Sequence, residues 1–478
     1  MVFSSHIFVF YFLPLVLAGY YALLAFKAGP TLRHAFLTFA GMVFYGWWNP
    51  WFVLLMLGTT ALDYNLGRMI TNAAGNRPRQ KLAVTLSVIS NLGVLAFFKY
   101  TAFAVDSAQS LTRLWHGGEL VVPVFLQNIV LPAGISFYVF QSLSYCIDLY
   151  RGHARPAESF LDFTCFVSLF PHLVAGPIVR YGLIADQMRH RAHTVEGFTY
   201  GIARFCTGFA KKILLANPMG PIADACFGAH PDVLSFSTAW LGLVAYAFQI
   251  YFDFSAYSDM AVGLARMLGF KFCENFDSPY KSRSITEFWR RWHMSLSSFL
   301  RDYLYIPLGG NRKGPVRTYV NLMLVMLLGG LWHGASWNFI LWGALHGGML
   351  AIERALGRFA PGKWLPRVLS VPFTFLIVLC GWVFFRADNF ETATQYFQAL
   401  FAHRGTADAA WLLRAELFSS FNLFMLAVCT AIAFFSPTSQ QLLHVFKAWK
   451  AAAAMLVFLL AVAMLFTQGF NPFLYFQF

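Results

Sequence analysis

The sequence contains long apolar runs without a charged residue, such as residues 371–385 and 452–466. A helix needs roughly 20 predominantly apolar residues to cross a bilayer, and in lipid every backbone polar group must be bonded within a helix or a closed barrel. A membrane β-strand would alternate apolar and polar residues, and the run at residues 322–328 does not alternate. Only 12% of the residues are charged, against roughly 25% in soluble domains. We therefore expect an all-α polytopic membrane protein with roughly 11 to 13 helices.

The loops between the first predicted spans are basic. Lys27 and Arg33 follow the first span. Arg68 lies at the end of the third span, and Arg77 and Arg79 belong to the loop after it, which has no acidic residue. The positive-inside rule places both loops in the cytoplasm and the N-terminus in the periplasm. Residues 1–21 lack a basic n-region and a cleavage site, so they are expected to be a retained first span. The predicted spans are residues 7–26, 35–48, 52–69, 82–103, 129–149, 371–385, 421–435 and 452–466.

The chain as a whole is basic, with 35 Lys and Arg against 21 Asp and Glu and a net charge of +14. In a membrane protein this excess favours cytoplasmic loops and anionic lipid as the partner, and not nucleic acid. The seven cysteines are scattered singly without a C-x-x-C pair. They are typical of buried apolar side chains, so neither a disulfide framework nor a metal site is expected.

Residues 160–350 differ from the rest because arginines and prolines interrupt their apolar runs. Polar, broken backbone at membrane depth is tolerated only where protein buries it or where it lines a water-filled cavity. We expect a central tunnel or funnel here, lined by broken and amphipathic helices. The expected organisation is one transmembrane domain over residues 1–478, with N-terminal spans (1–155), a catalytic core (160–350) and C-terminal spans (365–470).

Within this core, Ser284 and Glu287 match a capping box and predict that a helix begins there. At 100° per residue from Phe288 to Tyr303, the apolar side chains fall within about 120° of one another. Arg290, Arg291, Arg301 and several serines occupy the other face, and His293 lies at the boundary. Such a helix lies along an interface or a cavity wall; a simple interfacial anchor is the alternative.

The next apolar run, residues 319–331, leads into Gly-Gly-Leu-Trp-His-Gly at residues 329–334. An ionisable side chain at membrane depth marks a functional site by default, and histidine is suited to general-base chemistry. His333 is therefore the predicted base, with glycines that allow a ligand to approach. His346 would lie about 220° away on a continuous helix, so we expect it to be structural unless the helix breaks at residues 334–337.

Motifs of several other enzyme classes are absent. The sequence contains no G-x-S-x-G, P-loop, H-E-x-x-H or G-x-G-x-x-G motif. A buried histidine without a serine nucleophile is compatible with proton abstraction from a hydroxyl that attacks an activated acyl group.

With these features the chain resembles the membrane-bound O-acyltransferase family, and most closely its bacterial alginate O-acetylation branch. The resemblance runs in collinear order from the first residues to about residue 390. It is carried by residues 1–5, 131–138, 140–142, 170–177, 251–259, 285–293, 308–312 and 329–334.

The resemblance implies a multi-pass O-acyltransferase of the bacterial cytoplasmic membrane. Its signature histidine corresponds to His333, and His293 is a second catalytic candidate. Members take an acyl group from a cytoplasmic thioester, usually acetyl-CoA, without a bound cofactor, and soluble periplasmic acetyltransferase proteins encoded in the same exopolysaccharide operon complete the transfer. The implied substrate-binding residues are Trp289, Arg290, Arg291, Arg301, Asn311 and Trp332.

Several alternatives remain at this point. Arg290, Arg291, Arg301, Arg312 and Lys313 could contact coenzyme A phosphates, or equally lipid headgroups. Peptidoglycan O-acetylation and teichoic-acid D-alanylation proteins share the histidine motifs with the exopolysaccharide branch. A polysaccharide transporter or export channel is the alternative from another class, although no paired halves with matching broken helices are visible.

Overall fold

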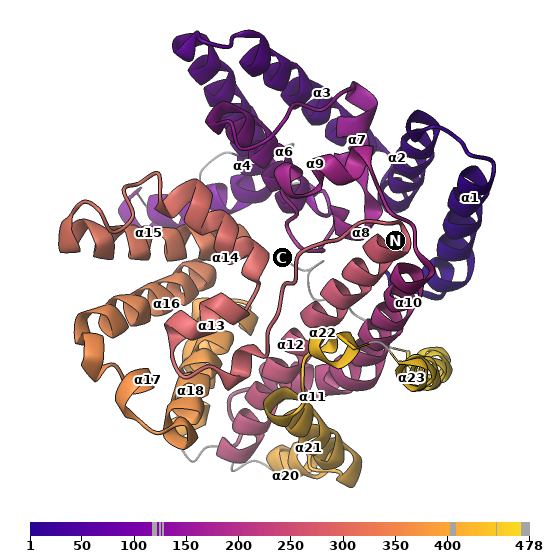
Figure 1. Ribbon diagram of the computed structural model, residues 1–478. Helices are drawn as coiled ribbons and strands as arrows, with labels where there is room; N and C mark the ends of the chain where they lie inside the picture. Colours follow the sequence, from indigo (N-terminus) through magenta and orange to yellow (C-terminus); the bar gives the residue numbers. More distant parts are fainter. Residues whose placement is uncertain (117–121, 124–125, 127–128, 402–407, 446, 470–478) are drawn as a thin grey trace. The chain divides into compact units, whose positions relative to one another are not determined.

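The computed structural model describes residues 1–116, 122–123, 126, 129–401, 408–445 and 447–469. These residues form helices and turns, and none of them forms a strand. The predicted all-α fold is thereby confirmed (Figure 1). Packing divides the chain into two compact units, residues 1–202 with 261–273 and residues 203–260 with 274–478. The expected single transmembrane domain stays a prediction.

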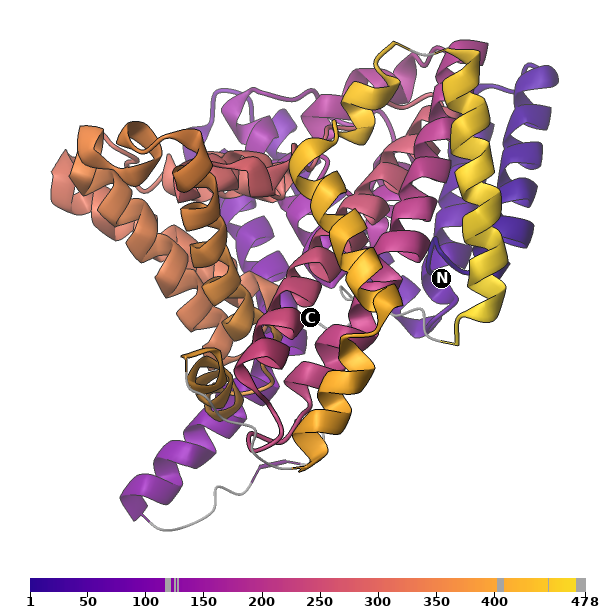
Figure 2. The same ribbon diagram turned by 90° about the horizontal axis from the view of Figure 1, so that it is seen from below.

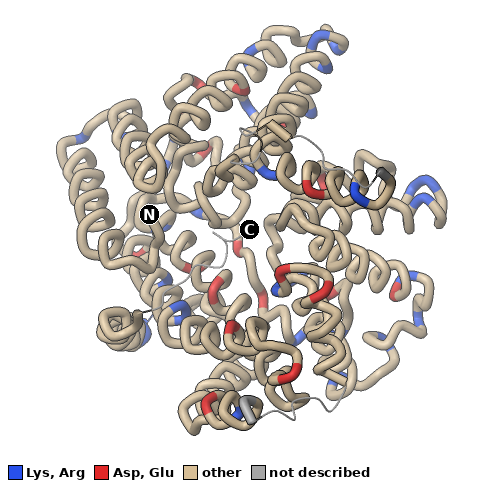
Figure 3. The backbone as a smooth tube through the Cα atoms, turned by 180° about the vertical axis from the view of Figure 1, so that it is seen from behind, with Lys and Arg blue, Asp and Glu red and all other residues tan. Residues whose placement is uncertain are grey.

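The first unit contains most of the predicted N-terminal spans. The turn at Asn49–Pro50 separates α2 from α3, and Gly134, in the left-handed conformation, precedes α6. Basic residues gather at the turn between α3 and α4, as Figure 3 shows. The helices of this unit are η1 (Phe8–Phe12), α1 (Leu13–Ala25), α2 (Pro30–Gly46), α3 (Trp51–Asn72), α4 (Arg77–His116), α6 (Ile135–Arg151), α7 (Phe160–Ser168), α8 (Phe170–Leu173), α9 (Tyr181–Arg189), the first half of α10 (Val195–Ala210) and the end of α12 (Phe236–Met267) from residue 261.

The second unit combines long helices with short, broken ones. The broken segments lie in the region where the sequence predicts them, but α12, α15 and α16 are continuous within it. After α10 its helices are η2 (Lys211–Ala216), α11 (Asn217–Phe227), α12 (Phe236–Met267) up to residue 260, η3 (Pro279–Lys281), α13 (Ile285–Arg291), α14 (Met294–Leu300), η4 (Arg301–Tyr305), α15 (Gly314–His333), α16 (Trp337–Leu356), η5 (Gly357–Phe359), α17 (Pro361–Trp364), α18 (Arg367–Arg386), α19 (Phe390–Phe401), α20 (Asp408–Leu417), α21 (Ser420–Phe435), α22 (Ser439–Leu443) and α23 (Ala448–Thr467).

Several of these helices are suited to crossing a membrane. Among the described residues, five are long and apolar enough: Phe8–Ala25, Arg77–Trp115, Gly314–His333, Arg367–Arg386 and Ala448–Thr467. A sixth candidate is the pair Ala410–Leu417 and Ser420–Phe435, which bends by 58°. The chain is therefore a multi-pass membrane protein, and its other predicted spans form helices that are shorter or more polar than these six.

Ionic contacts lie deep inside the second unit. The Lys212 Nζ atom is 2.8 Å from an oxygen of Asp253 on α12, and the two side chains are only 3% and 2% exposed. Lys212 belongs to the π-helical segment η2, which the yellow helix α23 covers on one side (Figure 2). Removing one partner of such a pair leaves a buried charge uncompensated, whereas replacing both with apolar groups is often tolerated.

We predict that Lys212→Met lowers the free energy of unfolding by about 3–5 kcal/mol. The double variant Lys212→Met/Asp253→Leu should recover most of that loss, since it leaves no unpaired carboxylate. Thermal unfolding of the purified proteins in detergent measures both. Equal unfolding temperatures for the wild type and the single variant would contradict the prediction.

Candidate active site

The candidate site is built on the hairpin of α15 and α16. Helix α15 ends at His333, because Gly334 is extended and Ser336 begins the next helix from an extended conformation. The helix therefore breaks between His333 and His346, within residues 334–337, and the angle of about 220° expected for a continuous helix does not apply. The Trp342 ring packs against both imidazoles, with ring centroids 5.1 Å from His333 and 4.8 Å from His346.

Glycines allow the two helices of this hairpin to touch through their backbones. A Cβ atom on Gly330 would lie 2.1 Å from the Phe339 carbonyl oxygen, and one on Gly343 would lie 2.4 Å from that of Met326. Because carbonyl oxygens within helices cannot rotate away, only glycine fits at these two positions. Small residues at such contacts are the usual means of close helix packing in membranes.

The capping signal at Ser284 is partly confirmed. The Ser284 hydroxyl accepts a hydrogen bond from the Glu287 amide at 3.1 Å, but the Glu287 carboxylate accepts from the Arg283 amide. The backbone amides of Ile285 and Thr286 donate to the Glu353 carboxylate of α16 at 2.6 and 2.9 Å. A negative charge at this helix N-terminus stabilises α13 and fixes it to the hairpin.

The expected continuous amphipathic helix is wrong beyond Arg291. Trp292 is extended and His293 has φ 43°, so the segment divides into α13 and α14. The reason is a competing set of backbone bonds: the Asp277 amide donates to the Arg291 carbonyl, and the Met294 amide donates to the Asn275 carbonyl, both at 3.0 Å.

The predicted cavity wall is nevertheless present. A cavity of about 510 Å³ lies between the α13–η4 segment and one face of α15. His333 reaches it from the end of α15, and Trp289, Arg290 and Arg301 are the other predicted site residues on its wall. The remaining lining residues are Thr286, Met294, Leu296, Ser297, Ser298, Leu300, Tyr305, Leu322, Val325, Met326, Gly329, Trp342 and Leu350.

His293 lies behind this wall. Its ring is 0% exposed, and its centroid is 6.3 Å from that of His333 and 4.6 Å from that of Phe254. Burial lowers the pKa of His293 to about 3, so the imidazole is neutral at physiological pH. The structure thus brings the two predicted catalytic histidines together, with only His333 on the cavity.

Other predicted binding residues lie off the cavity wall. Arg291 pairs with Glu287 at 2.9 Å and with Asp277 at 3.4 Å, and Asn311 is exposed and accepts a hydrogen bond from the Tyr305 hydroxyl. Trp332 is buried, with its ring centroid 5.8 Å from that of His293. Arg312 and Lys313 are exposed and are not among the lining residues.

His346 has a structural environment. Its Nδ1 atom accepts a hydrogen bond from the Trp289 indole at 3.3 Å, and its ring is stacked on that of Phe288. It therefore fixes a cavity-lining tryptophan to α16. Sequence reasoning missed Trp342, which contacts both histidines. Trp342 lies nine residues after His333, and this spacing indicates a contact only when the hairpin of α15 and α16 is known.

The arrangement combines one imidazole, cationic side chains and apolar walls around one cavity. Such a cavity can hold an anionic ligand with its reactive end beside His333. Among the described residues, no group of three or more His, Cys, Asp and Glu side chains is placed to hold a metal ion.

Comparison with known proteins gives consistent matches. The family model of MBOAT, the membrane-bound O-acyltransferase family, matches residues 152–387. The probable alginate O-acetylase AlgI of Pseudomonas putida is 44% identical over the full length of both chains. That of Pseudomonas aeruginosa is 49% identical, covering 87% of this chain and 78% of its own. The peptidoglycan O-acetyltransferase of Helicobacter pylori is 35% identical, covering 85% of this chain and 81% of its own.

We predict that Gly343→Ala destabilises the hairpin by about 1–3 kcal/mol, because the new methyl group must push α15 away. Gly348→Ala is the matched control on the same helix, since nothing lies within 4 Å of its added Cβ atom. The control should be neutral or slightly more stable. Thermal unfolding in detergent measures the difference, and equal stability of the two variants would refute the backbone contact.

Proposed function

The chain belongs to the membrane-bound O-acyltransferase family, and from this premise we propose that it transfers an acetyl group from cytoplasmic acetyl-CoA for the O-acetylation of an exopolysaccharide. The observation that carries the proposal is the position of His333, at the end of an apolar helix and on the wall of a cavity that also presents Arg290 and Arg301.

In the proposed reaction His333 is the general base. The acceptor hydroxyl oxygen attacks the thioester carbonyl carbon while the imidazole takes the hydroxyl proton. The tetrahedral intermediate then expels the coenzyme A sulfur, so the C–S bond breaks as the C–O bond is retained. The imidazolium returns the proton to the departing thiolate, which leaves an acetyl ester, free coenzyme A and neutral His333.

Arg290 and Arg301 are proposed to bind the phosphates of coenzyme A. Both lie on the cavity wall, and guanidinium groups bind phosphate oxygens through paired hydrogen bonds. Arg301 also pairs with Asp302 at 2.6 Å, so its charge is partly neutralised before any ligand binds. Trp289, which His346 holds in place, would form the apolar wall beside the donor.

The relatives support the choice of acceptor. The proteins named as alginate O-acetylases match 87–100% of this chain at 40–49% identity, and the peptidoglycan enzyme matches 85% of it at 35% identity. A teichoic acid D-alanyltransferase is 27% identical over 55% of this chain. We therefore favour alginate or a similar exopolysaccharide over peptidoglycan or teichoic acid, and an enzyme over an export channel.

The same proposal includes the membrane in which the chain lies and the proteins with which it acts. Basic N-terminal loops support a bacterial cytoplasmic membrane location with a periplasmic N-terminus. An acceptor polymer outside the cell would then require periplasmic acetyltransferase proteins to complete the transfer.

We predict that His333→Ala lowers acetyl transfer by about 10²- to 10⁴-fold, since general-base assistance is worth that much. Mass spectrometry of the secreted polymer and coenzyme A release from membrane vesicles measure the loss. His230→Ala is the matched control, because that side chain is 72% exposed. Retained acetylation in a correctly inserted His333→Ala protein would refute the enzyme and favour the channel.

We predict that Arg290→Ala and Arg301→Ala each raise the KM for acetyl-CoA by about tenfold, the value of one charge-assisted contact. Arg312→Ala should leave KM unchanged, because Arg312 is exposed and lies off the cavity wall. Initial rates in vesicles against acetyl-CoA concentration measure the difference. If the arginines bind lipid headgroups instead, KM stays constant and the rate depends on anionic lipid.

A further inference from the structure

The break between α13 and α14 is held by a coil that precedes it in the chain. The amide of Asp277 donates to the carbonyl of Arg291, and the amide of Met294 donates to the carbonyl of Asn275, both at 3.0 Å. These two bonds bracket Trp292 and His293. The left-handed φ of 43° at His293 is uncommon for a residue with a side chain, and it persists only where neighbouring contacts impose it.

The side chain of Asn275 adds three further bonds. Its Oδ1 atom accepts from the backbone amide of Ser295 at 3.2 Å and from the Ser295 hydroxyl at 2.9 Å. Its Nδ2 atom donates to the Ser258 hydroxyl of α12 at 3.1 Å. Asn275 is 1% exposed, so water does not replace these bonds. The residue therefore ties the first turn of α14 to α12.

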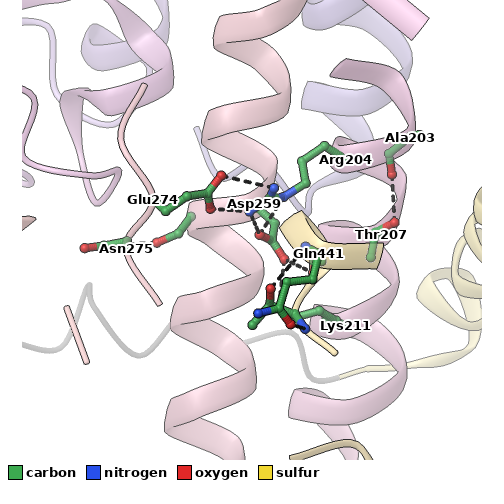
Figure 4. Close-up of polar contacts among 11 residues, drawn as sticks. Ala203, Arg204, Thr207, Lys211, Asp259, Glu274, Asn275 and Gln441 are labelled. Atoms are coloured by element: carbon green, nitrogen blue, oxygen red, sulfur yellow. Dashed lines mark hydrogen bonds and ion pairs between the residues drawn. The ribbon is translucent and has the colours of Figure 1, made fainter. Parts of the chain in front are cut away.

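A cluster of buried and half-buried charges fixes the coil immediately before Asn275. Figure 4 shows the Arg204 guanidinium between the carboxylates of Glu274 and Asp259. The Arg204 Nε atom donates to Asp259 at 2.8 Å, and Nη1 donates to Glu274 at 3.2 Å. Lys211 contacts the other Asp259 oxygen at 2.7 Å. Moving Glu274 would separate these charges inside the protein, which is costly.

We propose that Asn275 is a positioning residue: it holds the Trp292–His293 break in place and thereby sets the His293 ring beside His333. Its kinetic consequence rests on the proposed function. Asn275 does not line the cavity at His333, so it acts through the backbone of α14. A shift of the His293 ring would be transmitted to the His333 ring, whose centroid is 6.3 Å away. A displacement of a reacting group by about 1 Å can lower a rate by as much as 10²-fold.

The test compares variants that remove different numbers of these bonds. Asn275→Ala removes all three side-chain bonds, whereas Ser295→Ala and Ser258→Ala each remove one hydroxyl contact. Asn217→Ala is the matched control, a buried asparagine of the same unit whose amide donates to Gln468 at 2.8 Å. We expect kcat to fall on the order of 10- to 100-fold in Asn275→Ala and by about 2- to 5-fold in the serine variants, with the KM for acetyl-CoA within about twofold.

A second measurement does not depend on acyl transfer. Diethyl pyrocarbonate modifies accessible imidazoles, and peptide mass spectrometry of the detergent-purified protein identifies which histidine has reacted. His293 is fully buried and should be protected in the wild type and in Asn217→Ala. It should become reactive in Asn275→Ala and, more weakly, in Ser295→Ala, which is the milder change if Asn275→Ala folds poorly.

Two results would overturn the proposal. One is unchanged His293 protection and unchanged kcat in Asn275→Ala. The other is an equal loss of kcat and protection in Asn217→Ala, which would show a general loss of structure. If His333→Ala retains full acetyl transfer, the proposed function fails while the labelling still decides whether Asn275 places His293.

Discussion

The direct backbone contact between α15 and α16 is the constraint on which the site depends. At Gly330 and Gly343 each helix presents a bare backbone to the carbonyl oxygens of the other. This close approach puts Trp342 against both His333 and His346 and allows Glu353 to reach the start of α13. One interhelical distance therefore sets the positions of the imidazole, the aromatic wall and the segment that closes the cavity.

Charged side chains elsewhere in the second unit are paired with one another inside the protein. Lys212 and Asp253 neutralise each other, and Arg204 and Lys211 surround Asp259. Water is scarce in such an interior, so each charge needs a partner inside the protein. Arg204, which is paired with Asp259 of α12, also holds Glu274 in the coil at residues 274–277. The coil in turn bonds to Arg291, where α13 ends.

Much of the fold follows from local sequence patterns. Uninterrupted apolar runs give α15, α18, α21 and α23 to within a few residues, and Ser284 marks the start of α13 because its capping bond is local. His333 could be selected because an ionisable residue among apolar ones is costly and so conspicuous. The same reasoning applied to residues 211–212, 253 and 259 would have indicated the buried ion pairs.

The rest could not be predicted because it depends on contacts distant in sequence. The break at His293 arises from bonds to residues 275 and 277, and no periodicity within residues 288–303 reveals it. Arg291 and Asn311 have the chemistry of ligand-binding residues, but both already have partners within the protein. Arg291 pairs with Glu287 and Asp277, and Asn311 accepts a hydrogen bond from Tyr305. The resemblance located the histidines in the chain, whereas only the structure shows which of them reaches the cavity.

The location of His333 as the last residue of α15 has an electrostatic consequence. Aligned peptide dipoles give the carboxyl end of a helix a partial negative charge, which favours a nearby cation by about 0.3–1 kcal/mol, and more where water is excluded. An imidazolium formed at His333 in the proposed reaction would be stabilised by the negative end of the helix that carries it. The helix terminus would then contribute stabilisation of the kind that an aspartate gives to the histidine of many hydrolases.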